Sequence, residues 1–212
     1  MNLIATFSRR WACAVSVAAL ATLPLGALAA DNSTPDGLVR QLSTEVVDAV
    51  KADKAIQAGD MSKIQALVDG KVLPHVNFKR LTASSVGRFW RQATPEQQER
   101  LQAEFRTLLM RTYAGALSQV KDQQLAFRPL RAAPTDTEVV VQTQVRGRGD
   151  PIQLDYRLEK TDKGWFIYDM NVLGIWLGDQ YRSSFAQEIS AKGIDGLIKT
   201  LADRNAKAAG AK

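Results

Sequence analysis

The chain has very little of the side-chain chemistry that builds metal centres and covalent crosslinks. Its 212 residues include one cysteine, Cys13, and one histidine, His75. A zinc site draws three or four ligands mainly from these two residue types, so we expect neither a metal nor a cofactor. A lone cysteine also excludes a disulfide within the chain. The fold must therefore be held by its apolar core.

Acidic residues are absent from the first 30 positions, and these contain the one long hydrophobic run. Arg9-Arg10 precedes an apolar run at 11–28 that ends in the small-residue pattern Ala27-Leu28-Ala29. This order predicts a signal peptide, residues 1–30, that is removed on export. A retained anchor is the alternative, since the run approaches the roughly 20 residues that a span needs. Pro24 near its end favours cleavage.

A strong charge of one sign is also missing from the remainder. Removing the two arginines of the leader from 28 basic residues leaves 26, against 22 acidic residues, a net charge of +4. These charges are dispersed and form no basic stripe, so nucleic acid is not expected as a partner. The remaining length suits one domain with a sizeable core. We place this domain at 31–205, followed by a tail at 206–212 that we expect to be disordered.

Catalytic motifs are lacking as well. The sequence has no G-x-S-x-G nucleophile elbow and no glycine-rich phosphate loop that opens a helix. His75 follows a proline at the end of a predicted helix, where a surface role is the simpler interpretation. No activity as an enzyme is expected. The alternative is an enzyme with a single carboxylate base on a cone-shaped sheet, for which Asp169 is the nearest strand candidate.

Hydrophobic periodicity predicts helices, then strands, then helices. The expected helices begin near Leu38, near Ile64 and at Thr82, Pro95, Gln180 and Ile194, and the last one ends at Asn205. Four strands are expected at 125–130, 138–146, 152–159 and 165–172. The pattern predicts an α+β fold in which helices cover a twisted antiparallel sheet, cone-shaped and NTF2-like, with an apolar pocket between them.

Two local patterns are specific enough to fix details. Thr94-Pro95-Glu96-Gln97 predicts a capping box at the start of a long helix, with proline at its first position. In the strand at 165–172, alternation predicts that Phe166, Tyr168, Met170 and Val172 share one face. Large apolar side chains are numerous, and periodicity alone favours the interpretation that they simply fill the core.

Several stretches taken in order resemble one family. They are 72–76, 87–97, 105–109 with Tyr113, 165–171 and 192–197. Together they resemble the MlaC family, also called the Tgt2 or toluene-tolerance family, which is the periplasmic component of the Mla lipid-trafficking system. Two positions depart from the family pattern: Asn77-Phe78 follows the Leu-Pro element, and Leu173-Gly174 replaces a Glu-Gly pair.

The resemblance implies a monomeric, non-enzymatic carrier in the periplasm. Such carriers take phospholipid between an outer-membrane lipoprotein–porin complex and an inner-membrane ABC transporter complex with an MCE-domain ring, and so maintain outer-membrane lipid asymmetry. Phospholipid would be cargo rather than a cofactor. A hopanoid or another hydrophobic ligand is an alternative cargo. A chaperone or adaptor that binds peptide is a further alternative.

A carrier needs a dry slot, and we place it between the long helix and the sheet. The residues expected to contact acyl chains are Leu101, Phe105, Leu109 and Tyr113 from the helix, and Val141, Ile152, Leu154, Tyr156, Tyr168 and Met170 from the sheet. The residues expected to gate the mouth are Phe78, Leu81 and Trp90. Arg80, Arg88 and Arg91 are expected beside the headgroup, which stays outside because a buried phosphate without partners is costly.

Overall fold

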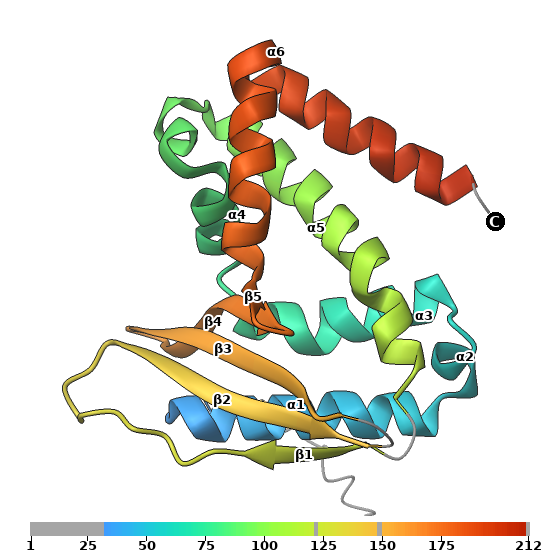
Figure 1. Cartoon of the computed structure of the whole chain (residues 1–212), viewed down its shortest axis with the longest axis vertical. Coiled ribbons are helices and arrows are strands. Elements are labelled where there is room, and N and C mark those ends of the chain that lie inside the picture. Colours follow the sequence, from blue (N-terminus) through green and yellow to red (C-terminus); the bar gives the residue numbers. More distant parts are fainter. Residues whose placement is uncertain (1–31, 121–122, 148–149, 211–212) are drawn as a thin grey trace, which may run out of the picture.

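An antiparallel meander forms the sheet in a computed structural model that describes residues 32–120, 123–147 and 150–210 (Figure 1). Its strands pair in sequence order, β1-β2-β3-β4-β5. Their bounds are Gln124–Phe127, Glu138–Arg146, Ile152–Thr161, Gly164–Val172 and Ile175–Trp176. The predicted signal peptide lies outside the described residues. The α+β fold with helices against an antiparallel sheet is confirmed.

The prediction of four strands is wrong by one short strand. β5 has two residues, and its Ile175 pairs with Val172 across a two-residue turn at Leu173-Gly174. Both turn residues have positive φ, 54° and 89°, as a type I′ hairpin turn requires. A leucine is rarely found in this conformation, so its sequence gives no signal for a hairpin. Leu173 is 67% exposed at this tip.

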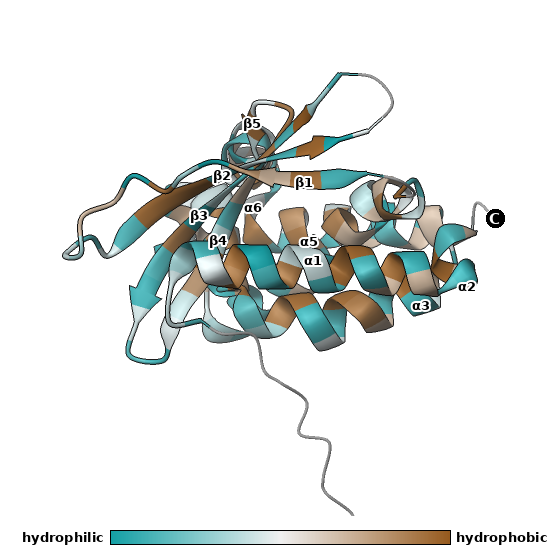
Figure 2. Cartoon of the chain, turned by 90° about the horizontal axis from the view of Figure 1, so that it is seen from below, coloured by the Kyte–Doolittle hydropathy of each residue, from teal (hydrophilic) through white to brown (hydrophobic). Residues whose placement is uncertain are grey.

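Helices precede and follow the sheet. The N-terminal helices are α1 (Pro35–Ala52), α2 (Lys54–Gln57), α3 (Met61–Leu67), the π-helix η1 (Val68–Val72), the 3-10 helix η2 (Leu73–His75), α4 (Phe78–Val86) and the 3-10 helix η3 (Gly87–Gln92). The long helices are α5 (Pro95–Ser118) and α6 (Leu177–Gly210). Figure 2 shows apolar residues recurring among polar ones along α1 and α5, as expected for helices that bury one side.

α1 covers part of one sheet face. Leu38, Val39 and Leu42 of this helix pack on Val141 and Leu158 of the sheet, together with their neighbours in one buried cluster. Residues two apart on a strand share a face, so the opposite face carries the polar residues of β2 and β3. Figure 1 shows α1 running along the sheet while α4 and α6 rise from its β4–β5 side.

A β-bulge changes the alternation expected for β4. Leu158 pairs with Ile167 but the preceding Arg157 pairs with Asp169, so Tyr168 is the extra residue. The prediction that Phe166 and Tyr168 share a face with Met170 is therefore wrong. Met170 lies on the apolar face, whereas the Tyr168 hydroxyl donates to Glu138 at 3.0 Å on the polar face. A bulge shifts the period by one residue, which alternation alone does not reveal.

The helix expected from Thr82 to Gln92 begins earlier and ends earlier. Asn77 caps α4, its side chain accepting from the Arg80 backbone N–H at 3.0 Å. The helix ends at Val86 because Gly87 has φ 64°. The chain then continues as η3. The preceding predicted helix also stops as an α-helix at Leu67 and passes through η1 and η2 across Pro74.

α5 begins with the predicted capping box. The Gln97 N–H donates to Thr94 Oγ1 at 3.2 Å, and the Thr94 N–H donates to Gln97 Oε1 at 3.0 Å. The expected change from the helix that begins at Gln180 to the one that begins at Ile194 falls at Gly193, which has φ 73° inside α6. After it, the helix continues past Asn205 to Gly210, where alanines and a lysine favour a helix. Within the described residues, no helix is long and apolar enough to cross a membrane.

Replacing Thr94 by alanine removes one half of the capping box, so we expect a loss of about 1 kcal/mol in the free energy of unfolding. Urea unfolding followed by circular dichroism measures this loss. Thr107→Ala is the control, because that hydroxyl only donates to the Ala103 carbonyl within α5. Equal effects of the two changes would contradict a stabilising role for the cap.

Candidate functional site

The described residues bury three separate apolar clusters rather than one continuous core. The helical cluster joins α4, α5 and α6 around Phe105 and Leu197. The sheet cluster joins α1 to the sheet around Val141 and Leu158. The corner cluster joins α1, α2, α3 and α5 around Ile64. A domain of this size usually has one contiguous core, so the space between the clusters is of interest.

Half-buried apolar side chains pack against each of these clusters, and two of them join one cluster to another. Met170 packs against both the helical and the sheet cluster, and Val46 packs against both the sheet and the corner cluster. The set, called here the interior seam, comprises Val46, Leu109, Met110, Tyr113, Leu117, Leu154, Met170 and Val172. These side chains come from α1, α5, β3 and β4. All of them retain exposed apolar surface although they border the core, and such surface is suited to an apolar guest.

The structure divides the residues predicted on α5. Leu101 and Phe105 are fully buried, and Phe105 packs edge-on against Tyr181 and Phe185 with ring centroids 5.0 and 5.2 Å apart. They form the helical cluster and leave no surface for a guest. Leu109 and Tyr113 lie one and two turns further along and belong to the interior seam.

The residues predicted on the sheet are divided in the same way. Val141 and Tyr156 lie beneath α1 and are buried. Leu154 and Met170 are half-buried and belong to the seam, and Met170 pairs directly with the buried Tyr156. Ile152 is 44% exposed at the end of β3. α1 thus covers Val141 and Tyr156, whereas Leu154, Met170 and Ile152 keep part of their surface exposed.

The seam carries no charged side chain. Burial raises the pKa of the Tyr113 hydroxyl, with Tyr181 adding to this and a hydrogen bond to Gln180 at 3.1 Å opposing it. Burial also raises the pKa of the nearby Tyr156 hydroxyl, which lies 3.5 Å from Ser43 Oγ. Both tyrosines therefore stay neutral at physiological pH. An uncharged lining suits hydrocarbon and offers no group for general acid–base chemistry near neutral pH.

Asp169, the candidate base, is held in a network of structural hydrogen bonds. Its carboxylate accepts backbone N–H groups of Met170 at 2.9 Å and Gly178 at 3.0 Å and pairs with Arg157 at 3.0 Å. Burial raises the pKa of this carboxyl, and these hydrogen bonds oppose that shift. Asp169 lies on the polar side of β4, away from the seam. Among the described residues, no cluster of histidine, cysteine and acidic side chains could hold a metal.

The predicted mouth residues lie mostly in a different place. Arg80, Arg88, Arg91 and Trp90 line an open groove of about 620 Å³ along α4, η3 and α6, here called the arginine groove, together with Phe89 and Arg182. None of the seam residues lines it. Figure 1 places the segment between α4 and α5 at the end of the helical layer remote from the sheet.

The remaining gate residues are packed in the helical cluster. Leu81 is 5% exposed, and Phe78 packs on Phe105 at a centroid distance of 5.9 Å. Arg80 is held by Glu138 at 2.7 Å and by Glu159, and it stacks on Tyr168 at 3.6 Å. This arginine therefore fastens α4 to the polar face of the sheet.

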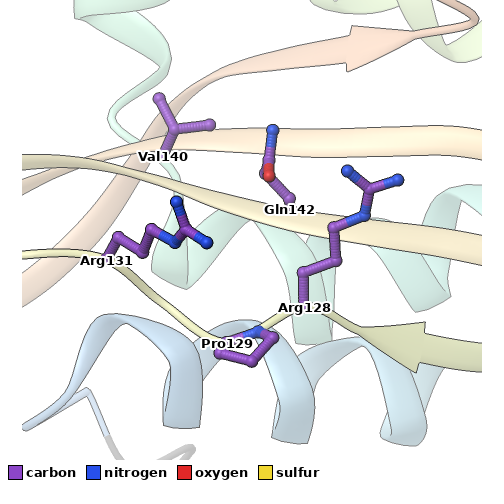
Figure 3. Close-up of a pocket in the computed structure, with 5 residues that line it drawn as sticks. All are labelled: Arg128, Pro129, Arg131, Val140 and Gln142. Carbon is purple, nitrogen blue, oxygen red and sulfur yellow. The ribbon is translucent and has the colours of Figure 1, made fainter.

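A second pocket, of about 490 Å³, lies on the polar face of the sheet. Figure 3 shows Arg128 and Arg131, which follow β1, beside Val140 and Gln142 of β2. Val140 alternates with the buried Val139 and Val141, so this pocket and the interior seam are on opposite faces. Neither pocket is the predicted slot.

Sequence reasoning missed half of the seam. Met110 and Leu117 extend the α5 stripe of Leu109 and Tyr113, since 109, 113 and 117 recur at four-residue spacing. That spacing was a usable signal. Val172 also had a signal, since it alternates with Met170 on β4. Val46 is recognised only through its contacts with two packed clusters.

Comparisons with known proteins find chains that are similar in sequence and fold. A solved phospholipid-binding protein from Ralstonia solanacearum, determined in complex with a phospholipid, is 46% identical and superposes with a TM-score of 0.78 over 81% of this chain and 96% of that one. Toluene tolerance protein ttg2D of Pseudomonas putida is 28% identical over 183 residues, covering 86% of this chain and 84% of that one.

A further relative matches over a longer stretch of the chain. The intermembrane phospholipid transport system binding protein MlaC of Haemophilus influenzae is 23% identical over 202 residues, covering 93% of each chain. The family model described as MlaC protein matches residues 40–203. This match spans most of the chain and includes all five strands of the antiparallel sheet. The chain therefore belongs to the MlaC family.

Proposed function

We propose that the interior seam holds the acyl chains of one phospholipid while the headgroup stays in solvent. The observation that carries this proposal is the set of half-buried, uncharged apolar side chains that border three packed clusters. The phospholipid complex of the Ralstonia solanacearum relative, at 46% identity, supports it. Of the residues expected from the sequence, Leu109, Tyr113, Leu154 and Met170 are the contacts, with Ile152 at the end of the sheet.

The physical need for such a carrier follows from solvation. A two-chain lipid has roughly 30 methylenes, and their exposure costs on the order of 20 kcal/mol at about 0.8 kcal/mol each. Free diffusion through water is therefore negligible. A seam that recognises tails by area and dispersion takes little information from the headgroup, so we expect weak headgroup selectivity.

The same proposal gives the chain its setting. An exported protein with a cleaved leader works in the periplasm, moving phospholipid between an outer-membrane lipoprotein–porin complex and an inner-membrane ABC transporter complex with an MCE-domain ring. The chain acts without catalysis and without a cofactor, and the lipid is its cargo. The name of the Haemophilus influenzae relative supports transport between membranes.

Native mass spectrometry of the purified mature chain tests the binding function. We expect about one phospholipid per chain, which organic solvent extracts for identification. An empty chain, or one that carries peptide, would contradict the proposal. A hopanoid in place of phospholipid would keep the carrier and change its cargo.

Replacing Leu154 by lysine places a charge inside the seam, so we expect the lipid content to fall by about tenfold or more, because an unpaired charge among acyl chains costs several kcal/mol. Leu109→Lys, which places the charge on the α5 side of the seam, should lower the lipid content to a similar extent. Extraction and phosphorus assay measure the content.

The matched control is Val140→Lys, on the polar face of the sheet and 42% exposed. It should retain its lipid. Circular dichroism shows whether each variant is folded. A folded Leu154→Lys chain with full lipid content would show that the acyl chains lie elsewhere.

Removing the lipid should lower the melting temperature. A ligand present at about a hundred times its Kd stabilises the native state by about 2.7 kcal/mol, which corresponds to about 5–10 °C for a chain of this size. Scanning calorimetry before and after delipidation measures the shift, and adding lipid back should restore it. An unchanged melting temperature would count against a guest that completes the interior.

A further inference from the structure

The arginine groove combines an apolar floor with unpaired positive charge. Its lining contains four arginines and no acidic residue. The floor is built from small side chains of α4 and α6, Ala83, Ser84 and Ala186. Phe89 and Trp90 form one wall while they also pack against the helical cluster. A concave surface of this kind can accept a side chain as well as a charge.

Two of the four arginines already have partners. Arg80 is held by Glu138 and Glu159. The Arg182 Nε–H donates to the Ser84 carbonyl at 3.1 Å, and its guanidinium lies 3.5 Å from Asp179, both side chains being more than half exposed. These contacts hold Arg80 and Arg182 in place along the groove. Because both guanidinium groups already face carboxylates, they offer little free positive charge to a ligand.

The other two arginines have no carboxylate partner within the described ranges. Arg88 lies over the Phe89 ring at 5.0 Å, and Arg91 is exposed. Both belong to η3, a 3-10 helix, in which residues three apart lie one above the other. The two side chains therefore leave the same side of this turn, and both line the groove. Gly87, with φ 64°, directs the chain from α4 into η3 and so sets this position.

Arg88 and Arg91 therefore bring positive charge to a groove whose lining contains no acidic side chain. Beside them, Phe89 and Trp90 supply the residue types that, with arginine, are enriched where proteins bind one another. Planar guanidinium groups bind carboxylates through paired hydrogen bonds. Seam residues do not line the groove, so a headgroup whose tails occupy the seam is not its natural occupant.

We infer that the arginine groove is a docking site for an acidic segment of a partner protein, one in which carboxylates flank an apolar side chain. Arg88 and Arg91 bind the carboxylates, and the apolar side chain enters between Phe89, Trp90 and Ala186. This inference deepens the proposed function, on which its biological sense rests, because a carrier must dock in order to load and unload.

The test uses the full mature chain and a short fluorescein-labelled peptide in which glutamates flank one leucine. Fluorescence anisotropy should show binding that weakens as salt rises. Arg88→Glu with Arg91→Glu should weaken the binding by about tenfold or more, since it replaces attraction by repulsion. A peptide with glutamine in place of glutamate should not bind.

Two further variants separate the groove from general charge. Lys54→Glu with Lys63→Glu changes the net charge equally at exposed sites on α2 and α3, and we expect it to alter binding by less than about twofold. Ala186→Trp fills the groove floor without changing any charge, and we expect it to weaken binding by about fivefold or more. Equal losses in the lysine variant, or full binding by Ala186→Trp, would reduce the effect to surface attraction and overturn the inference.

Lipid content, measured on the same variants, distinguishes the two proposals. It should be unchanged in the Arg88→Glu, Arg91→Glu chain. Loss of lipid there would assign the arginines to the headgroup, and binding to phosphatidylglycerol vesicles without peptide binding would assign them to a membrane surface; either result overturns docking. A wild-type chain that binds the peptide but contains no lipid would refute the carrier function and leave the groove standing.

Discussion

Apolar surface left half-exposed inside a protein is unfavourable by about 25 cal/mol for each Å² that water still reaches, and the interior seam keeps such surface on eight side chains. The fold tolerates this cost because the three clusters around the seam are packed without it. Phe105 and Leu158, for example, are fully buried in two different clusters. Hydrocarbon from a guest would remove the remaining surface from water. Binding and completion of the core are then the same event, which is the physical basis of a carrier.

The position of α1 on the sheet decides which residues of the apolar face belong to the interior seam. α1 closes the apolar face over Val141 and Tyr156, while Leu154 and Met170 stay half-buried. The bulge at Tyr168 keeps Met170 on the apolar face and turns the tyrosine toward Arg80 and Glu138 on the polar one. α5, started by its capping box, carries packed residues in its first half and seam residues in its second. The same helix therefore contributes residues both to the helical cluster and to the interior seam.

Charge is kept apart from the seam. The carboxylate of Asp169 is satisfied by backbone N–H groups and Arg157 on the polar side of the sheet, and Arg80 is neutralised by two glutamates. Arg88 and Arg91, which have no carboxylate partner among the described residues, lie on η3 at the far end of the helical layer. A carrier gains from this separation, since tail binding by area and partner recognition by charge can change independently.

The sequence alone was sufficient for what depends on neighbours along the chain. The capping box at Thr94, the break at Gly193, the strands β2 to β4 and the ordered resemblance to the MlaC family were all predictable from it. Tertiary structure decided which side chains reach a guest. Leu101 and Leu109 lie on the same helix stripe, yet α4 and α6 cover the first and leave the second half-buried. Arg80 and Arg88 look alike in sequence, yet only Arg80 meets two glutamates from distant strands. Periodicity reveals which residues share a face, but what covers that face depends on elements far away in the sequence, whose positions the whole fold sets.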